Sequence, residues 1–173
     1  NPKIIYIDKK DYLEESKYDY HLAMGSIPKF LRNSKKSFET NAHPLIKVDE
    51  EKSNRLRNQL INPQVKKIVG ISWKSNGKTN IGRSIKLEEL ISQINSPHIC
   101  FVNLQYGDVN EEISNVKSKL GIEIKEINEI DNFHDLDGLA SLIKACDEVV
   151  TIDNVTAILS GALGVNTNVI LSV

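Results

Sequence analysis

Cysteine is scarce in this sequence: the 173 residues contain two, Cys100 and Cys146. They lie far apart and form no Cys-x-x-Cys pair, so neither a zinc site nor a disulfide framework is supported. Each lies in or beside an apolar segment, and we expect two buried free thiols. The histidines also lack metal-ligand spacing, so we expect ordinary surface or loop side chains at His21, His43, His98 and His134.

An excess of one charge and a long apolar run are missing as well. The 22 Lys and Arg residues nearly balance the 23 Asp and Glu residues, giving a formal net charge of -1. Such a chain has no overall electrostatic attraction to nucleic acid or to an anionic membrane. No apolar run approaches the roughly 20 residues that cross a bilayer. We therefore expect no nucleic-acid partner and no transmembrane segment.

Three common motifs are absent. No Gly-x-Gly-x-x-Gly follows a predicted strand, which argues against NAD, and there is no Gly-x-Ser-x-Gly elbow. The segment Ser75–Thr79 ends like a P-loop, but position 72 is Ser where that motif needs Gly. Residues 80–82 continue a loop where the motif needs a helix, so we exclude a P-loop.

The chain does have an ordinary globular composition and, after residue 60, a regular alternation of strands and helices. Hydrophobic residues make up 40% and charged residues 26%, as in a domain with a real core. Continuous apolar runs such as Lys67–Trp73 are typical of strands covered on both faces. The sequence therefore predicts an α/β fold, with a Rossmann-like parallel sheet and helices on both faces. We expect further strands at 99–104, 122–124, 148–152 and 169–171, and helices at 87–94, at 111–120, from about 135, and at 155–163.

The first 60 residues are less regular. Short β-rich runs occur at Lys3–Ile7 and Tyr20–Met24, and Pro28 suits the first turn of a short helix. Residues 33–44 are polar and lack periodicity. A helix that begins near Asp49 must end before Asn62-Pro63, because the residue before a proline disfavours helical geometry. We therefore place a domain boundary near residue 60, which divides the chain into 1–60 and 61–173.

Candidate ligand residues follow the strands, because an open parallel sheet binds ligands beyond its carboxyl ends. The loop Lys74–Ser84 combines cations, glycines and hydroxyl groups that suit a phosphate or diphosphate, with a solvated basic loop as the alternative. Asp153–Thr156 opens a helix and suits an anion, unless Asp153 only caps that helix. Asp135 and Asp137 either form a carboxylate pair or complement a helix start.

Several of these segments, in this order, resemble a group of bacterial glycosyltransferases. The best match is Asp147–Ala157, which continues into Gly161–Gly164. The group is the heptosyltransferase-like family nine, which often carries upstream tetratricopeptide repeats and is related in fold to O-linked N-acetylglucosamine transferases. The other matching segments are Val69–Lys74, Gly82–Ile85, Phe101–Tyr106, Leu136–Ala140 and Asp19–Pro28.

The resemblance implies a GT-B architecture, in which two Rossmann-like domains face a cleft and the C-terminal one binds a nucleotide-sugar donor. Residues 1–60 would end the N-terminal, acceptor-side domain, and 61–173 would form a C-terminal domain truncated at its end. The reaction would transfer a sugar, with inversion and without a metal, to a glycan or protein acceptor in the cytoplasm.

The same resemblance assigns roles to residues. Lys74, Arg83 and the helix start at Asp153 would neutralise the diphosphate, with Arg suited to holding two phosphate oxygens at once. Gln105 and Tyr106 would meet the base or ribose. The full expected binding set is Ser72, Lys74, Arg83, Gln105, Tyr106, Asp153, Asn154, Val155 and Thr156. No catalytic base is assigned.

Two departures from the family keep other hypotheses open. The family usually has histidine at the position of Ile158, which cannot donate a hydrogen bond, and alanine at that of Ser160. The sequence also lacks the glycine-rich start of the N-terminal domain, and Asn168–Val173 reads as a buried strand with nothing after it, so we expect a partial chain. The alternatives are a non-catalytic relative, serving as a nucleotide-sugar-binding or protein-interaction module, and an unrelated Rossmann-like nucleotide binder.

Overall fold

The structure is a computed structural model that describes residues 19–20, 22–23, 26–38, 44–75 and 84–171. The chain divides into two compact units, Asn1–Asn41 and Ala42–Val173. In the first unit, α1 (Pro28–Leu31) begins at the proline as predicted, and a 3-10 helix, η3, spans Lys35–Phe38. The expected strand at residues 3–7 lies outside the described residues. Tyr20, Leu22 and Ala23 are described and form no strand, so that part of the expected second strand is wrong.

The second unit is a five-stranded parallel sheet, which confirms the predicted fold class. The strands are β1 (Lys67–Ser72), β2 (Ile99–Asn103), β3 (Ile124–Lys125), β4 (Glu148–Ile152) and β5 (Asn166–Ile170). Their order is β3-β2-β1-β4-β5, and all described pairs are parallel. β1 is therefore central, and its carboxyl end lies between those of β2 and β4.

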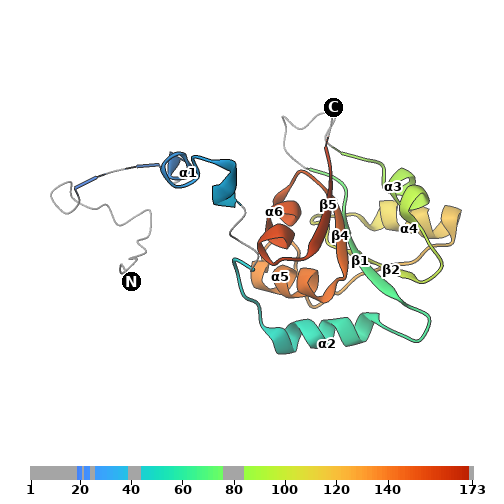
Figure 1. The fold of residues 1–173 in the computed structure, drawn as a ribbon. Helices are drawn as coiled ribbons and strands as arrows, with labels where there is room; N and C mark the ends of the chain where they lie inside the picture. The colour runs from blue at the N-terminus through green and yellow to red at the C-terminus, as the bar shows by residue number, and fades with distance from the viewer. Residues whose placement is uncertain (1–18, 21, 24–25, 39–43, 76–83, 172–173) are drawn as a thin grey trace. The chain divides into compact units, whose positions relative to one another are not determined.

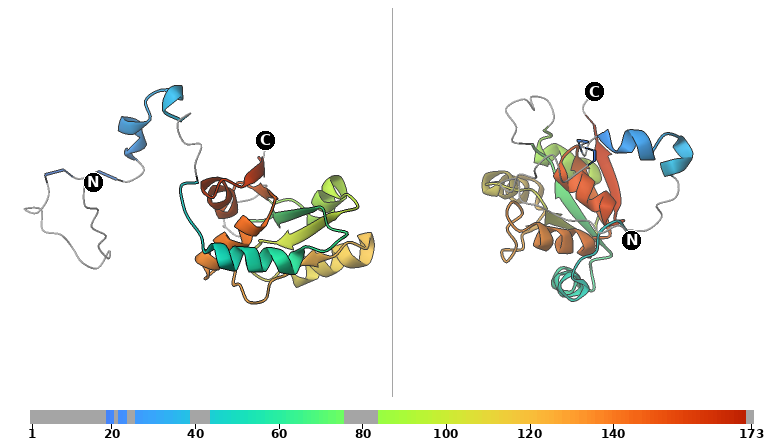
Figure 2. Two further views of the ribbon diagram at one scale, coloured as in Figure 1. Left: turned by 60° about the horizontal axis from the view of Figure 1, so that its bottom comes forward. Right: turned by 90° about the vertical axis from the view of Figure 1, so that its left-hand side faces the viewer.

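Helices cover both faces of this sheet (Figures 1 and 2). On one face α3 (Leu87–Ile94) and α4 (Asn110–Leu120) pack against side chains such as Val69 and Ile71 of β1. On the other face α2 (Glu50–Leu60), α5 (Leu136–Ala145) and α6 (Val155–Ala162) form a core that includes Ile68. Neighbouring β1 residues thus alternate between the two cores, as the pleat of a strand requires.

Local sequence signals set several helix ends. Asp49 caps α2 by accepting a hydrogen bond of 2.9 Å from Lys52 N. Gly121 ends α4 with a φ of 68°, the left-handed conformation that glycine adopts without a Cβ penalty. The predicted glycine stop is therefore confirmed.

The structure places α2 in the second compact unit, whereas the predicted domain boundary near residue 60 assigns this helix to the first part of the chain. Asn62-Pro63 does end this helix, but α2 packs on α5 within the second compact unit. Arg57 joins the two helices by donating 2.7 Å hydrogen bonds from Nη1 to Ala145 O and from Nη2 to Asp147 Oδ1. A helix break alone does not separate domains when the helix has long-range partners. The assignment of the first 60 residues to an acceptor-side domain stays a prediction.

The last strand is exposed rather than buried, which corrects the expectation for Asn168–Leu171. β5 lies at an end of the sheet and pairs with β4 alone among the described strands. Val169 and Ile170 are 41% and 37% exposed. The continuous apolar run did not correctly predict burial in this strand. The burial of an edge strand depends on which other elements pack over it.

None of the helices described by the structure combines the length and the apolar character that a membrane span requires.

Candidate functional site

The candidate site lies where the carboxyl ends of β2, β1 and β4 meet. Ser72 is the last residue of β1, Gln105 follows β2 by two positions, and Asn154 follows β4 by two positions. Because these strands are neighbours in the sheet, their ends bring together residues that are 33 to 82 positions apart along the chain. We call the hydrogen-bonded group of Ser72, Gln105, Thr151 and Asn154 the edge network.

Gln105 is the centre of the edge network. Its side chain is 1% exposed, and its Oε1 accepts hydrogen bonds from Ser72 Oγ (3.0 Å), Trp73 N (3.0 Å) and Lys74 N (2.9 Å). These bonds satisfy backbone groups that leave the ladder where β1 ends. Gln105 therefore fixes the path of the chain into the loop that begins at Lys74, which is a positioning role.

Asn154 completes the network from the β4 side. Its Nδ2 donates to Ser72 Oγ at 2.8 Å, and its Oδ1 accepts from Thr151 Oγ1 at 3.1 Å. The same Oδ1 accepts from Thr156 N (2.9 Å) and Ala157 N (3.4 Å) at the start of α6. Asn154 is therefore the N-cap of α6. Asp153, the cap considered from the sequence, is exposed. The two backbone donors already bind a protein oxygen, and Val155 beside them is 59% exposed.

Lys74 carries the cation that the sequence placed here. Its Nζ lies 2.7 Å from Glu112 Oε2 and 3.4 Å from Asp108 O, so the ammonium group is directed to the start of α4. The second expected cation, Arg83, lies outside the described residues. Two contacts join the flanks of the loop: Ile85 N donates to Trp73 O at 2.9 Å, and Ser75 N donates to Ser84 Oγ at 3.3 Å.

A polar cavity of about 270 Å³ lies beside the edge network, at the ends of β2 and β3. Gln105 and Tyr106 line it together with Asn132, whose Nδ2 donates to the backbone oxygens of Asn103 (3.2 Å) and Gln105 (3.1 Å). Asn132 Oδ1 is buried and has no hydrogen-bond partner. Since Gln105 both lines the cavity and binds Lys74 N, the cavity and the base of the lysine loop are adjacent.

An aromatic group borders this cavity. The rings of Tyr106 and Phe133 lie 5.5 Å apart, and His134 approaches Phe133 edge-on at 4.7 Å. Asp131 organises the turn by accepting from Phe133 N (2.8 Å), His134 N (3.0 Å) and His134 Nδ1 (2.9 Å). The hydrogen bond from His134, followed by those from the two backbone groups, lowers the pKa of Asp131 to about 2.

Sequence reasoning missed this turn. It treated His134 as an ordinary loop histidine and did not select Asn132 or Phe133. The available signal was a polar and aromatic stretch, Asp131–His134, which begins six positions after the end of β3. Because β3 has only two residues, the sequence did not show where that strand ended.

Asp135 is a helix cap. Its Oδ1 accepts from Gly138 N at 2.7 Å at the start of α5, and its Oδ2 lies 3.5 Å from Lys52 Nζ. This supports the capping alternative over a carboxylate pair with Asp137.

Among the described residues, no group of three or more His, Cys, Asp and Glu side chains is arranged to hold a metal.

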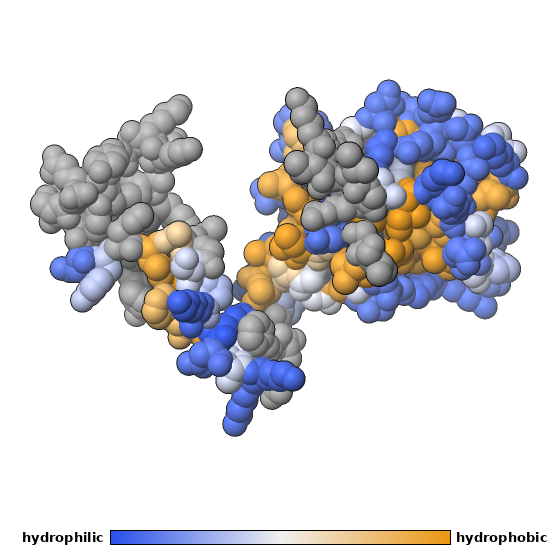
Figure 3. Space-filling model, turned by 90° about the horizontal axis from the view of Figure 1, so that it is seen from above, coloured by the Kyte–Doolittle hydropathy of each residue, from blue (hydrophilic) through white to orange (hydrophobic). Residues whose placement is uncertain are grey.

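Hydrophobic surface also occurs at the carboxyl edge. Figure 3 views the molecule from above, the side toward which β5 runs in Figure 1, and shows hydrophobic areas on the unit that carries the sheet. Phe133 and Leu136, which follow β3, are 60% and 57% exposed, and Ile158 on α6 is 72% exposed. The edge therefore combines a buried polar network with exposed apolar side chains.

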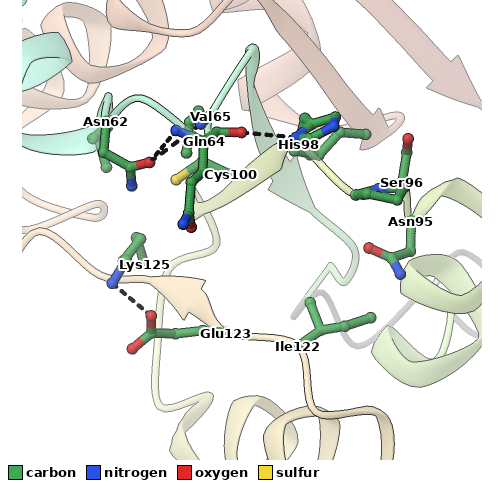
Figure 4. A pocket seen from close by; sticks show the side chains of 13 residues that line it. Asn62, Gln64, Val65, Asn95, Ser96, His98, Cys100, Ile122, Glu123 and Lys125 are labelled. Atoms are coloured by element: carbon green, nitrogen blue, oxygen red, sulfur yellow. Dashed lines mark hydrogen bonds and ion pairs between the residues drawn. The ribbon is translucent and has the colours of Figure 1, made fainter.

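A larger hollow of about 640 Å³ lies at the opposite edge, around the amino ends of β1, β2 and β3 (Figure 4). Its polar groups largely satisfy one another: Asn62 Oδ1 accepts from Gln64 N at 2.9 Å, and Lys125 Nζ lies 2.6 Å from Glu123 Oε2. Burial raises the pKa of the Cys100 thiol beside it. We favour the smaller cavity as the site, because parallel sheets bind ligands at their carboxyl ends.

Comparison with known proteins gives one curated relative and a distant structural neighbour. No protein-family model matches the chain. Protein FlbA from Caulobacter vibrioides is 35% identical over 159 residues, in a match that covers 88% of this chain and 26% of FlbA. The chain thus spans about a quarter of that relative's length. The crystal structure of the glycosyl transferase family 9 protein from Veillonella parvula DSM 2008 has a TM-score of 0.46 at 10% identity, over 73% of this chain and 42% of that chain.

Proposed function

We propose that this chain is the donor-binding part of a glycosyltransferase, and that the whole protein transfers a sugar from a nucleotide-diphosphate sugar to a glycan or protein acceptor. The observation that carries the proposal is the edge network, which holds the start of the Lys74 loop next to a polar cavity with an aromatic border. A nucleotide-diphosphate sugar requires both a cationic group for its phosphates and a cavity for its base and ribose.

The roles of individual residues follow from their positions. Lys74 would bind the diphosphate by charge-assisted hydrogen bonds, which are stronger than neutral ones. Arg83 has the same expected role from the sequence resemblance alone. Tyr106 and Asn132 line the cavity in which the base or ribose would lie. Ser72, Gln105 and Asn154 would act through the backbone they position, since their polar groups bind one another.

A second candidate is a non-catalytic nucleotide-sugar-binding or protein-interaction module. Ile158 favours it, because this position usually holds a histidine in the glycosyltransferases that the sequence resembles. The side chain is 72% exposed on α6, at the edge that carries the proposed site, and an isoleucine can neither donate a hydrogen bond nor stabilise a leaving phosphate. Such a module would bind the nucleotide sugar without catalysing its transfer.

Calorimetric titration of the full-length protein with uridine, cytidine, guanosine and adenosine diphosphates tests the proposal. We expect at least one to bind at micromolar to low millimolar concentration, and Lys74→Ala to weaken it. Lys86→Ala is the matched control, because Lys86 is 84% exposed and contacts Glu89 of its own helix region. No binding of any nucleotide at millimolar concentration would overturn the proposal. Binding without sugar transfer or donor hydrolysis would favour the non-catalytic candidate.

A further inference from the structure

The ion pair between Lys74 and Glu112 places a protein carboxylate against the cation of the proposed site. The two groups lie 2.7 Å apart, and their side chains are 23% and 38% exposed, respectively. Their separation of 38 positions in the sequence arises because Lys74 follows β1 and α4 follows β2, the neighbouring strand. While this pair is formed, Glu112 neutralises part of the charge of the ammonium group and occupies one of its three N–H donors.

Glu112 lies at a helix start, a position that suits a carboxylate. It lies in the first turn of α4, where a carboxylate is favoured by the helix dipole, as is Glu111 beside it. Lys74, in contrast, directs a positive charge at that same helix start, where its only other described contact is Asp108 O at 3.4 Å. Without Glu112, the ammonium group would lie beside the partly positive end of a helix with no counter-ion in contact.

We propose that Glu112 is a resident counter-ion that a diphosphate ligand must displace from Lys74. This inference rests on the proposed function, because it concerns the same site. A phosphate oxygen and the Glu112 carboxylate compete for one ammonium group, so the free energy of the resident ion pair is subtracted from that of ligand binding. Glu112 thus acts through Lys74, by lowering the affinity of that lysine for the anionic ligand.

The size of the effect follows from the exposure of the pair. Partly exposed ion pairs stabilise proteins by roughly 0.2–1 kcal/mol, which corresponds to a change in affinity of about 1.4- to fivefold. Replacing Glu112 by glutamine keeps the side-chain shape and removes the competing charge. We therefore expect Glu112→Gln to tighten binding of a nucleoside diphosphate by about 1.4- to fivefold.

Glu111→Gln is the matched control for this variant. Glu111 is in the same helical turn, is exposed, and takes part in none of the ion pairs found among the described residues. Both substitutions remove one negative charge near the site, so a general electrostatic effect would appear in both. Only Glu112→Gln removes a direct competitor for Lys74, and the difference between the two variants isolates that competition.

The experiment is calorimetric titration of the full-length protein with uridine diphosphate and, separately, with inorganic diphosphate. Wild type, Glu111→Gln, Glu112→Gln, Lys74→Ala and the Lys74→Ala/Glu112→Gln double variant are compared, with thermal unfolding as the check of folding. The proposal predicts a gain for Glu112→Gln over Glu111→Gln that disappears when Lys74 is absent.

Three results would overturn it. An equal affinity in the two glutamine variants would show that only the general field matters. A weaker affinity in Glu112→Gln would show that Glu112 holds Lys74 ready for the ligand instead of competing with it. In both cases the proposed function survives if the wild type binds and Lys74→Ala binds more weakly. No binding by any variant would overturn the inference and the proposed function together.

Discussion

The side-chain amide of Asn154 donates a 2.8 Å hydrogen bond to the hydroxyl of Ser72, and so joins the ends of β4 and β1 across 82 positions of sequence. The same Asn154 caps α6 through its Oδ1. One side chain therefore fixes both the helix start and the strand end that frame the candidate site.

Asn154→Ala should lower the free energy of unfolding by about 1–2 kcal/mol, because it removes a helix cap and a hydrogen bond to the buried Ser72. Chemical denaturation measures the change. Asp153→Ala serves as the control: Asp153 is exposed and does not cap the helix, so its replacement should change stability by no more than about 0.5 kcal/mol. A larger loss for Asp153→Ala than for Asn154→Ala would show that the cap has been assigned to the wrong residue.

Gln105→Met should cost about 2–4 kcal/mol of stability. Methionine has a similar length but offers no comparable acceptor, so Ser72 Oγ, Trp73 N and Lys74 N would lose a shared partner in a buried place. Urea denaturation gives the value. Gln93→Met, at an exposed position on α3 with none of the described side-chain hydrogen bonds, should be close to neutral. Equal effects at the two positions would argue against the positioning role of Gln105.

Gly70→Ala should destabilise the protein by about 1–3 kcal/mol, because a Cβ there would overlap Leu104 Cδ1 and come within 3.1 Å of Cys146 Sγ in a packed core. Gly161→Ala is the opposite case, since a Cβ on this helical glycine meets nothing within 4 Å. It should be neutral or stabilise by up to about 1 kcal/mol. Thermal unfolding of both variants tests the pair, and a destabilising Gly161→Ala together with a neutral Gly70→Ala would contradict the packing described.

Asp131 should titrate with a pKa of about 2, below its ordinary value of 3.8. A carboxyl group whose pKa is lower in the folded state stabilises the fold above its unfolded pKa, and this contribution is lost as the pH falls from about 4 to 2. A carbon NMR titration of the carboxyl group measures the value. His134→Ala should move the pKa upward, because the His134 side chain is the largest cause of the shift. An unchanged pKa in that variant would show that the backbone hydrogen bonds are sufficient.

The sequence predicted the parallel sheet because its signals are local. The strands β1, β2 and β4 are mostly apolar runs. Gly121 and the apolar spacing of Leu87, Leu90 and Ile91 mark helices through local sequence alone. The predicted burial of the last strand was wrong, because the burial of an edge strand depends on which other parts of the fold pack against it. The packing of α2 on α5 likewise depends on contacts between segments about 80 positions apart, including Arg57 with Ala145.

The site was predicted only in outline. The rule about carboxyl ends named Ser72, Gln105 and Asn154, and the structure places all three at one edge of the sheet. It did not predict their hydrogen bonds, because these depend on the strand order β2-β1-β4. The sequence could not show that the amide of Gln105 binds the backbone of Lys74, or that Asn154 rather than Asp153 caps α6. Glu112 and Asn132 were missed because nothing in their local sequence separates them from other helix-start acids and loop amides.

The most direct test of the central claim is a crystal structure of the full-length protein with a nucleoside diphosphate bound. The account predicts phosphate density beside Lys74 at the carboxyl ends of β1 and β2, with the base or ribose in the cavity lined by Tyr106 and Asn132. Density in the opposite hollow, against Asn62 and His98, would contradict it.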